Sequence, residues 1–369
     1  MLDGMTETPK KSPSEHPERP DRHERDDSAD MERDTIALPS HVAGSGTLDR
    51  LVETARDYAR QAASENTMKA YAKDWAHFAR WCRMRGADPL PSSPQLIGLY
   101  IADLAAPGGK APALSVSSIE RRLSGLTWGY AQLGERLDRK DRHIASVLAG
   151  IRRKHARPPA QKEAILPEDL REMLATLPHN LRGLRDRAIL LIGFAGGLRR
   201  SEIVSLDYGK DDTSDSAGWA DIFDDGVLIT LRGKTGWREV EISRGSSDQT
   251  CPLHALNQWL HYAKIDFGPL FVAVSRNGLK ATSERLSDKH VARLIKSCAR
   301  EAGLRPDLPE AERVRLFSGH SLRAGLASSA EVDERYVQKQ LGHASAEMTR
   351  RYQRRRDRFR VNLTKAAGL

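Results

Sequence analysis

Apolar residues recur every three or four positions along most of the chain, which is the spacing of one face of an α-helix. In the first half of the chain this pattern predicts helices at residues 51–63, 67–85, 93–104, 115–133 and 141–154. The apolar stripe of the second helix is aromatic and consists of Tyr71, Trp75, Phe78 and Trp81. Consecutive helices without a strand pattern between them predict a small all-α domain over residues 47–155.

The pattern changes in the second half. Helical spacing predicts helices at residues 168–177, 184–194 and 200–206, the first of them started by Pro167. Two β-rich runs at 226–231 and 238–243 then lie on either side of a glycine-bearing turn, which predicts a hairpin. Helical patterns follow to the end of the chain. We therefore expect a mainly α protein with a small antiparallel β-sheet, whose second, α+β domain spans residues 166–369 after a linker at 156–165.

Composition adds limits on class. Residues 1–46 are charged, rich in Pro and Ser and nearly free of aliphatic side chains, which predicts a disordered tail. The sequence has neither a long apolar run nor a basic segment followed by an apolar one at its start, so we expect no membrane contact and a cytoplasmic protein. Cys82, Cys251 and Cys298 are odd in number and far apart, which favours reduced thiols in a core.

The formal net charge of +9 favours a polyanionic partner. A basic cluster ends the last helix of the first domain and consists of Arg152, Arg153, Lys154, His155 and Arg157. Such a cluster is typical of a contact with a DNA backbone, and equally of a helix C-terminus whose dipole attracts cations. Both interpretations stay open at this point.

Two glycine-bearing turns of the second domain have charged residues on them or just after them. Arg199 lies where a helix begins, two residues after Gly197, and its side chain and the free backbone N–H groups can face one anion there. Glu202, three residues on, either holds Arg199 in place or forms a simple surface ion pair. Lys234 lies on the hairpin turn, where it either donates a proton to a leaving oxygen or serves solubility.

The segment SGHSLRAG places His320 and Arg323 three residues apart. On a helix starting near Ser318 the two side chains project from one face, one as a hydrogen-bond donor and one as a fork matched to two phosphate oxygens. The alternative is a capped helix with an ordinary surface pair.

The segment LGHASAEMTRRY contains His343 and Tyr352, and Gly342 closes the helix before them. Six arginines surround this tyrosine: Arg350, Arg351, Arg354, Arg355, Arg356 and Arg358. We expect Tyr352 to be exposed in an electropositive setting, and Tyr336, which has aliphatic neighbours, to lie in a core.

Together these side chains suit the breaking and rejoining of a phosphodiester. Two arginines can bear the extra charge of a pentavalent transition state, and two histidines can add hydrogen bonds. A lysine can protonate the leaving 5′ oxygen, and a tyrosine can keep the bond energy as a phosphotyrosine, so no ATP is needed for resealing. Because guanidinium groups can take the charge role of a metal ion, we expect neither metal nor cofactor.

The order of these motifs resembles the tyrosine recombinases, the phage integrase family, from about residue 47 to the C-terminus. The resemblance implies six catalytic positions, Arg199, Lys234, His320, Arg323, His343 and the nucleophile Tyr352, with Glu202 in support. One departure from the family pattern is the polar stretch at 209–218, which leaves the register of the hairpin open.

The resemblance also implies a two-domain clamp on double-stranded DNA. Residues 47–155 would form the α-helical, SAM-like core-binding domain and residues 166–369 the catalytic domain. The implied activity is site-specific recombination through a 3′-phosphotyrosyl intermediate, in a tetramer on nucleoid DNA and with accessory proteins possible. The residues beyond Tyr352, including Val361 and Leu363, would dock on a neighbouring subunit or pack on their own domain. A type IB topoisomerase-like enzyme and a non-catalytic DNA-binding protein are the alternatives.

Overall fold

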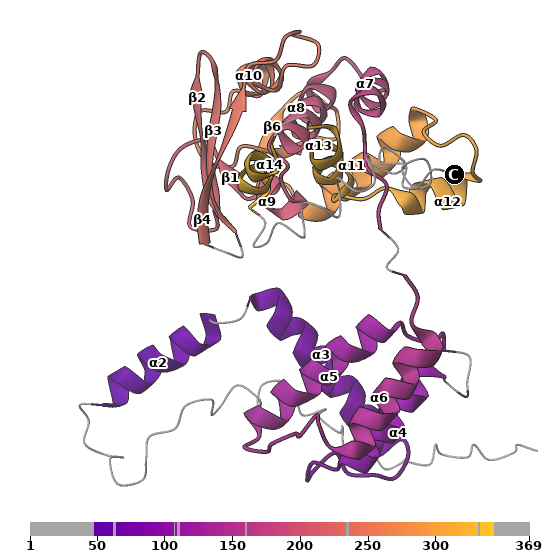
Figure 1. Cartoon of the computed structure of the whole chain (residues 1–369). Coiled ribbons are helices and arrows are strands. Elements are labelled where there is room, and N and C mark those ends of the chain that lie inside the picture. The colour runs from indigo at the N-terminus through magenta and orange to yellow at the C-terminus, as the bar shows by residue number, and fades with distance from the viewer. Residues whose placement is uncertain are drawn as a thin grey trace, which may run out of the picture. The chain divides into compact units, whose positions relative to one another are not determined.

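The computed structural model describes residues 48–61, 64–106, 108, 111–158, 161–233, 236–330 and 333–342. The chain divides into two compact units, residues 1–158 and 159–369, which are coloured along the sequence in Figure 1. The expected disordered tail at 1–46 lies outside the described residues. Among the helices that are described, none combines the length and apolar character needed to cross a membrane.

The described part of the first unit is helical, as expected, and the helix bounds differ from the predicted ones by two residues at most. Its helices are α2 (Asp49–Gln61), α3 (Glu65–Arg83), α4 (Pro94–Ala105), α5 (Val116–Gln132) and α6 (Arg142–His155). Four of these helices begin after a residue whose side chain accepts a hydrogen bond from a backbone N–H of the first turn: Ser64, Ser93, Ser115 and Asp141. These caps satisfy donors that a helix start leaves unpaired, which explains where the helices begin.

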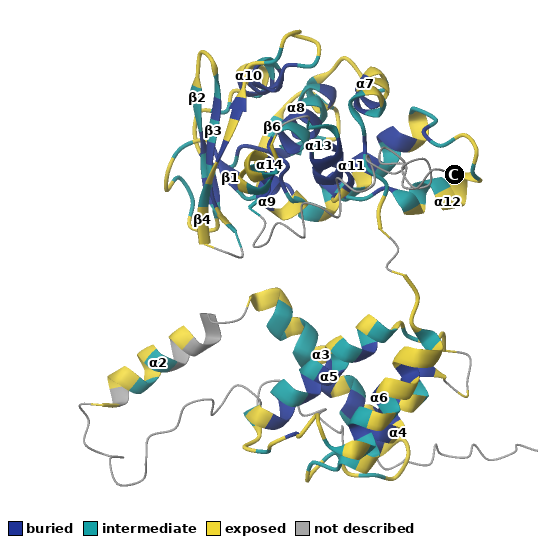
Figure 2. Ribbon diagram, viewed as in Figure 1, coloured by how far each residue is buried: buried dark blue, intermediate teal, exposed yellow. Residues whose placement is uncertain are grey.

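The core of the first unit is aromatic. Helix α3 packs against α5 and α4 packs against α6. Trp75, Phe78 and Trp81 of the predicted stripe are buried, and the ring of Trp75 lies 4.9 Å from that of Tyr130 on α5. The buried residues follow the inner faces of the helices in Figure 2, which confirms the stripe that the sequence predicted for α3.

The second unit combines helices with small sheets. Its helices are α7 (Pro167–Ala175), α8 (Leu181–Ala195), α9 (Arg200–Val204), α10 (Pro252–Ala263), α11 (Asp288–Glu301), α12 (Glu310–Leu316), α13 (Ser321–Ser329) and α14 (Glu334–Leu341). Its strands are β1 (Leu206–Asp207), β2 (Gly218–Phe223), β3 (Gly226–Gly233), β4 (Gly236–Ser243), β5 (Val272–Val274) and β6 (Ala281–Arg285).

The described sheet has the order β1-β2-β3-β4, and its β3–β4 pair is the predicted hairpin. Gly233 lies opposite Gly236, which settles the register that the sequence left open. The neighbouring pairs β2–β3 and β3–β4 are antiparallel, while the short β1 runs parallel to β2. Figure 1 shows the described helices of this unit on one side of the sheet.

Two expectations for the second unit were wrong. The helix predicted at 200–206 ends at Val204, because Leu206 and Asp207 pair with β2 instead. The chain after the hairpin is not purely helical, since β5 and β6 form a second, two-stranded sheet. Both strands are short, and β-propensity depends strongly on the packing context, so the sequence pattern did not single them out.

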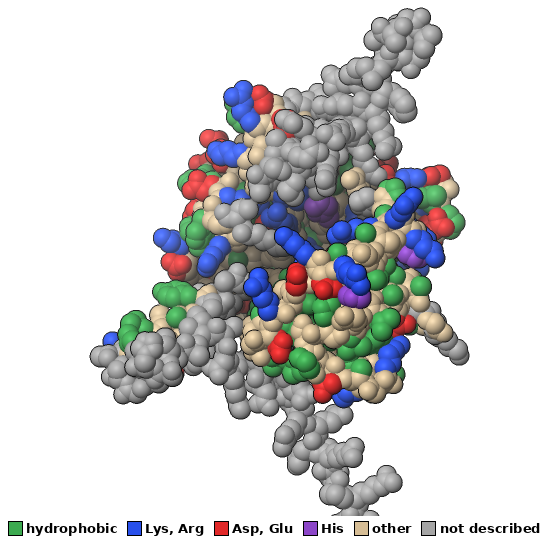
Figure 3. All heavy atoms as spheres, turned by 60° about the horizontal axis from the view of Figure 1, so that its bottom comes forward, with side chains coloured by type: hydrophobic (Ala, Val, Ile, Leu, Met, Phe, Trp, Pro, Cys, Tyr) green, Lys and Arg blue, Asp and Glu red, His purple; other side chains and the backbone are tan. Residues whose placement is uncertain are grey.

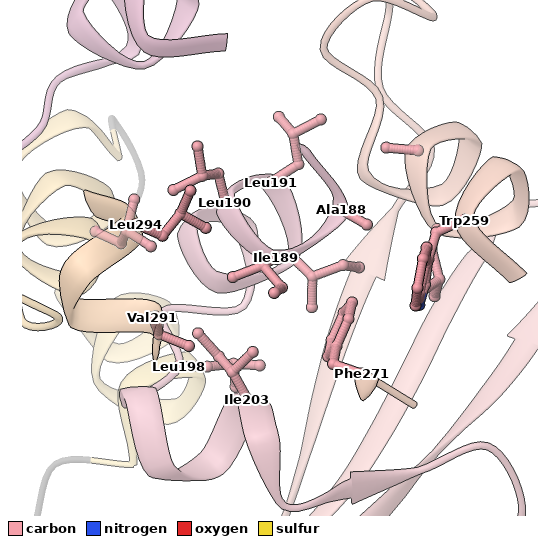
Figure 4. Close-up of a cluster of buried hydrophobic side chains, with 14 of the residues drawn as sticks. Ala188, Ile189, Leu190, Leu191, Leu198, Ile203, Trp259, Phe271, Val291 and Leu294 are labelled. Carbon is pink, nitrogen blue, oxygen red and sulfur yellow. The ribbon is translucent and has the colours of Figure 1, made fainter. Parts of the chain in front are cut away.

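Helix α8 lies at the centre of the second core. It packs against α10 and α13, and its residues Ala188, Ile189 and Leu190 are buried. Figure 4 shows these side chains in one cluster with Trp259 and Phe271 and with residues of α9 and α11. The Trp259 Nε1–H donates to the Leu270 carbonyl at 2.8 Å, so the one polar atom of this ring is satisfied.

The polar stretch at 209–218 is a closed loop held by Arg285 of β6. The Arg285 guanidinium binds Asp207 at 2.7 Å, the Thr213 hydroxyl at 2.7 Å and Asp215 at 3.0 Å. Asp207 is fully buried, and the arginine compensates its charge. The stretch is therefore an ordered loop, and the β3–β4 hairpin that follows it is in place.

The end of the expected linker is bound to the second unit. The Glu163 N–H donates to the Leu316 carbonyl at 3.0 Å and the Ile165 N–H to the Ser321 carbonyl at 3.1 Å. Ile165 is fully buried, which explains why this part of the segment joins a core. All three cysteines, each of which the structure describes, are buried and unpaired, as expected.

Candidate active site

Arg199 stands at a sharp turn between two helices. Gly196 is the C-cap of α8, and Gly197 has a φ of 56°, a left-handed value that glycine adopts at little cost. A Cβ at Gly197 would lie 2.4 Å from Cδ2 of Leu341, so the turn also needs the space. Arg199 is the N-cap residue of α9, directly after this turn.

Glu202 binds Arg199 at two points. Its Oε2 accepts the backbone N–H of Arg199 at 2.7 Å, and its Oε1 lies 2.5 Å from Nη1 of the guanidinium. The Glu202 side chain is 8% exposed and that of Arg199 is 32% exposed. The expected contact is therefore present and is no simple surface pair: a buried carboxylate fixes one edge of a guanidinium that still reaches solvent.

Arg238 of β4 also binds Glu202, and the sequence analysis did not single it out. Its Nη2 lies 3.0 Å from Glu202 Oε2, and its Nη1 donates to the Gln340 carbonyl. Side chains alternate between the two faces of a strand, so Arg238 shares the buried face of Val240 and Ile242. A charged residue at a core-face position was the signal available in the sequence.

Arg323 is buried on α13, so the alternative of an ordinary surface pair is wrong for this residue. The residue is 1% exposed. Its Nη1 donates to the Gly197 carbonyl at 2.7 Å, and its Nη2 donates to the Leu341 carbonyl. These carbonyls lie at the C-terminal ends of α8 and α14, where the helix itself supplies no donor. Gly325 allows α13 to lie close to the segment that contains Ile165, since a Cβ at Gly325 would lie 1.9 Å from the Ile165 carbonyl oxygen.

His320 is the N-cap residue of α13, so the helix begins at Ser321 and not near Ser318 as predicted. Its backbone N–H donates to Ser318 Oγ at 3.2 Å, and the residue is exposed. The pKa of His320 lies below its ordinary value of 6.5, first because neighbouring atoms partly desolvate the ring and then because Arg323 and Arg199 repel a proton. Both predicted arginines are therefore electrostatic neighbours of this imidazole.

The described charges of this cluster do not cancel. Arg199, Arg238 and Arg323 contribute three positive charges and Glu202 one negative charge, so the sum is 3 − 1 = +2. Such a surplus attracts anions, and a phosphodiester is one. Figure 3 shows Lys and Arg side chains spread over the face that it presents, among Asp, Glu and apolar side chains.

Three predicted site residues, Lys234, His343 and Tyr352, lie outside the described residues, as do Val361 and Leu363. Some of their described neighbours in the sequence lie beside the cluster: a Cβ at Gly233 would be 3.8 Å from Glu202 Oε1, and one at Gly342 would be 2.7 Å from Arg238 Cδ. Gly233 and Gly236 form the last pair of the hairpin whose turn contains Lys234. Gly342, the C-cap of α14 with a φ of 59°, directly precedes His343.

Tyr336 is 62% exposed, which corrects the expectation that it lies in a core. On α14 the buried positions are Val337 and Leu341, and Tyr336 falls on another face because successive helical residues are about 100° apart. The Arg335 guanidinium lies 5.7 Å from the ring centre. Aliphatic neighbours in the sequence therefore did not decide its burial.

Comparison with known sequences identifies a family. The sequence profile of the phage integrase family matches residues 163–358, more than half of the chain. An integrase/recombinase XerD homolog of Selenomonas ruminantium is 33% identical over 85% of this chain and 89% of its own length. The tyrosine recombinase XerD of Bradyrhizobium diazoefficiens is 28% identical over 80% of this chain and 87% of its own.

Solved structures show the same fold. XerH site-specific recombinase, bound to a palindromic difH substrate, is similar with a TM-score of 0.55 at 17% identity, over 82% of this chain and 79% of that one. A lambda integrase dimer bound to a COC′ core site gives a TM-score of 0.51 at 16% identity, over 82% and 93% of the two chains.

Proposed function

Because the chain belongs to the phage integrase family, the tyrosine recombinases, we propose that it is a site-specific DNA recombinase or integrase acting through a 3′-phosphotyrosyl intermediate. One observation in the fold carries this proposal. Arg199 and Arg323 come from distant parts of the sequence, yet the Arg323 guanidinium donates to the Gly197 carbonyl, two residues before Arg199, in a cluster with surplus positive charge. That is the arrangement that a phosphodiester in reaction requires.

In the proposed reaction Tyr352 is the nucleophile. Its oxygen forms a bond to phosphorus, and the bond from phosphorus to the 5′ oxygen breaks. Lys234 donates a proton to that leaving oxygen, which becomes a free 5′-hydroxyl. The hydroxyl of the partner strand then attacks the phosphotyrosine and releases Tyr352, so the phosphodiester energy is conserved throughout.

The described residues have a supporting part in this chemistry. Arg199 and Arg323 would neutralise the non-bridging oxygens, and their protein partners already hold them in place before DNA arrives. Groups oriented in advance need no rearrangement when charge develops in the transition state. His320, whose lowered pKa favours the neutral imidazole, and His343 would donate hydrogen bonds to the same oxygens.

Double-stranded DNA is the proposed partner; the similar XerH recombinase is bound to a palindromic difH substrate, and the lambda integrase dimer to a COC′ core site. Residues 47–155 would be the core-binding domain and residues 166–369 the catalytic domain of a clamp around the duplex. The basic end of α6, with Arg153 and Lys154 exposed, supports a backbone contact from the first unit. Exchange between two duplexes further implies assembly into a tetramer on nucleoid DNA.

The test is covalent capture on a nicked DNA substrate that cannot be resealed. We expect the wild-type chain to form a protein–DNA adduct and Tyr352→Phe to bind the same DNA without forming one, because the phenol oxygen alone makes the bond. Tyr336→Phe is the matched control. It removes the phenol oxygen of an exposed tyrosine on α14 and should leave the adduct unchanged.

The same assay separates the alternative activities. An adduct that persists in Tyr352→Phe would assign the nucleophile elsewhere, and binding with no adduct in the wild type would indicate a DNA-binding protein without catalysis. Recombinant product from two sites distinguishes a recombinase from a topoisomerase-like enzyme, which would relax a single duplex.

A further inference from the structure

Arg238 lies where three elements of the candidate active site meet. From β4 it reaches the Glu202 carboxylate on α9 and the Gln340 carbonyl in the last turn of α14. It also lies against Gly342, because a Cβ there would be 2.7 Å from Cδ and 3.0 Å from Nε of Arg238. One guanidinium therefore joins the residue that holds Arg199 to the point where the chain leaves α14.

Gln340 also binds the end of α14 to its neighbours, through its own side chain. Its Nε2 donates to the Ala195 carbonyl at 3.2 Å and to the Glu241 carbonyl at 3.0 Å. The end of α14 is thus bound to the end of α8 and to β4 as well as to Arg238. Movement of Arg238 would loosen this end and release one of the two arginine partners of Glu202.

Stability alone does not explain an arginine at this position. The Arg238 side chain is 11% exposed, and its Nε has no hydrogen-bond partner within the described part of the chain. Burial lowers the pKa of Arg238, and Glu202 opposes that effect. An aliphatic side chain like the neighbouring Val240 would pack here without desolvating a charge, and buried ion pairs often stabilise less than such packing.

We propose that Arg238 is a positioning residue for strand cleavage. It orients Arg199 through Glu202, and it fixes the end of α14, after which the sequence continues to His343 and Tyr352. This role rests on the proposed recombinase function. Arg238 acts through these groups and does not itself contact the reacting phosphate.

The experiment compares Arg238→Met and Arg238→Lys with a control, Arg244→Met. Arg244 lies one residue beyond β4, its side chain is 57% exposed, and its guanidinium pairs with Asp248, so its loss removes the same charge away from the site. Two quantities are measured: the Kd for the DNA site and the single-turnover rate of adduct formation with all DNA bound.

We expect Arg238→Met to lower the rate of adduct formation about 100-fold, the effect of a displacement near 1 Å in an active site. The Kd should change by only about twofold, because a buried guanidinium contributes little to backbone binding. Arg238→Lys should recover part of the rate, since an ammonium can still reach Glu202. Arg244→Met should leave the rate unchanged.

A double-mutant cycle tests whether Arg238 acts through Glu202. If it does, Glu202→Gln combined with Arg238→Met lowers the rate less than the product of the two single effects. Independent, multiplicative losses would overturn the proposal, as would equal losses in rate and affinity, or a rate loss that follows the fraction of unfolded chain in thermal denaturation. A wild-type chain without adduct would instead overturn the proposed function, and this role with it.

Discussion

At the scale of single residues, the two predicted arginines carry the same charge in different surroundings. Arg199 is about one-third exposed and pairs with a carboxylate. Arg323 is buried and donates to two backbone carbonyls, of Gly197 and Leu341. Arg199 is therefore held by a side chain at one edge, whereas Arg323 holds the ends of α8 and α14 together.

This difference predicts unequal costs of substitution. Arg323→Met leaves two buried carbonyls without these donors and should lower the free energy of unfolding by about 1–3 kcal/mol. Arg199→Met should cost about 1 kcal/mol or less, because Glu202 keeps Arg238 as a partner. Urea unfolding measures both, and adduct formation should fall far more than DNA affinity in each variant. Equal unfolding costs would contradict the structural part assigned to Arg323.

The lowered pKa of His320 predicts a pH dependence of stability. In the pH range between the lowered folded-state pKa and the ordinary value of 6.5, the unfolded chain binds a proton that the folded chain does not. The stabilisation is therefore complete above 6.5 and is lost as the pH falls through this range. His320→Asn should flatten the curve of unfolding free energy against pH here, and an unchanged slope would show that His320 is not the responsible group.

At the scale of elements, local pattern was sufficient for the helices of the first unit and for the β3–β4 hairpin. The β5–β6 pair was missed although Asn277 and Gly278 form a turn signal between its strands, and Gly278 has the expected positive φ of 78°. The two residues of β1 carry no pattern of their own and become a strand only beside β2. The motifs identified Arg199, His320 and Arg323, but the partners of these residues depend on tertiary contacts that no local spacing predicts.

The packing of α3 on α5 depends on small residues and gives an element-scale prediction. A Cβ at Gly129 would lie 2.4 Å from the Trp75 ring, whereas a Cβ at Gly150 in α6 would meet nothing within 4 Å. Gly129→Ala should destabilise the chain by about 1–3 kcal/mol through overpacking. Gly150→Ala should stabilise it by up to about 1 kcal/mol, since alanine favours helix. Thermal unfolding of the two variants should shift in opposite directions; a shared sign would contradict the close contact at Gly129.

At the scale of the whole molecule, positive charge occurs in both units. The cluster of the second unit has a surplus of two charges, and α6 of the first unit ends in Arg152, Arg153 and Lys154. Arg152 pairs with Glu120, so a contact with a DNA backbone would be made by Arg153 and Lys154. The sequence left open whether this end binds DNA or only satisfies the helix dipole. A clamp around DNA requires that it binds DNA.

The salt dependence of DNA binding decides between these two roles. If Arg153 and Lys154 each neutralise a phosphate, replacing both by Gln should reduce the slope of log Kobs against log salt by about 1.8. The adduct rate at saturation should not change, because these residues contact only the backbone. Lys140 and Arg142, exposed at the opposite end of α6, provide a control with the same loss of charge. If both double substitutions change the salt slope equally, the C-terminal end of α6 makes no specific DNA contact and attracts DNA only through its net charge. The basic end of α6 would then no longer support the clamp.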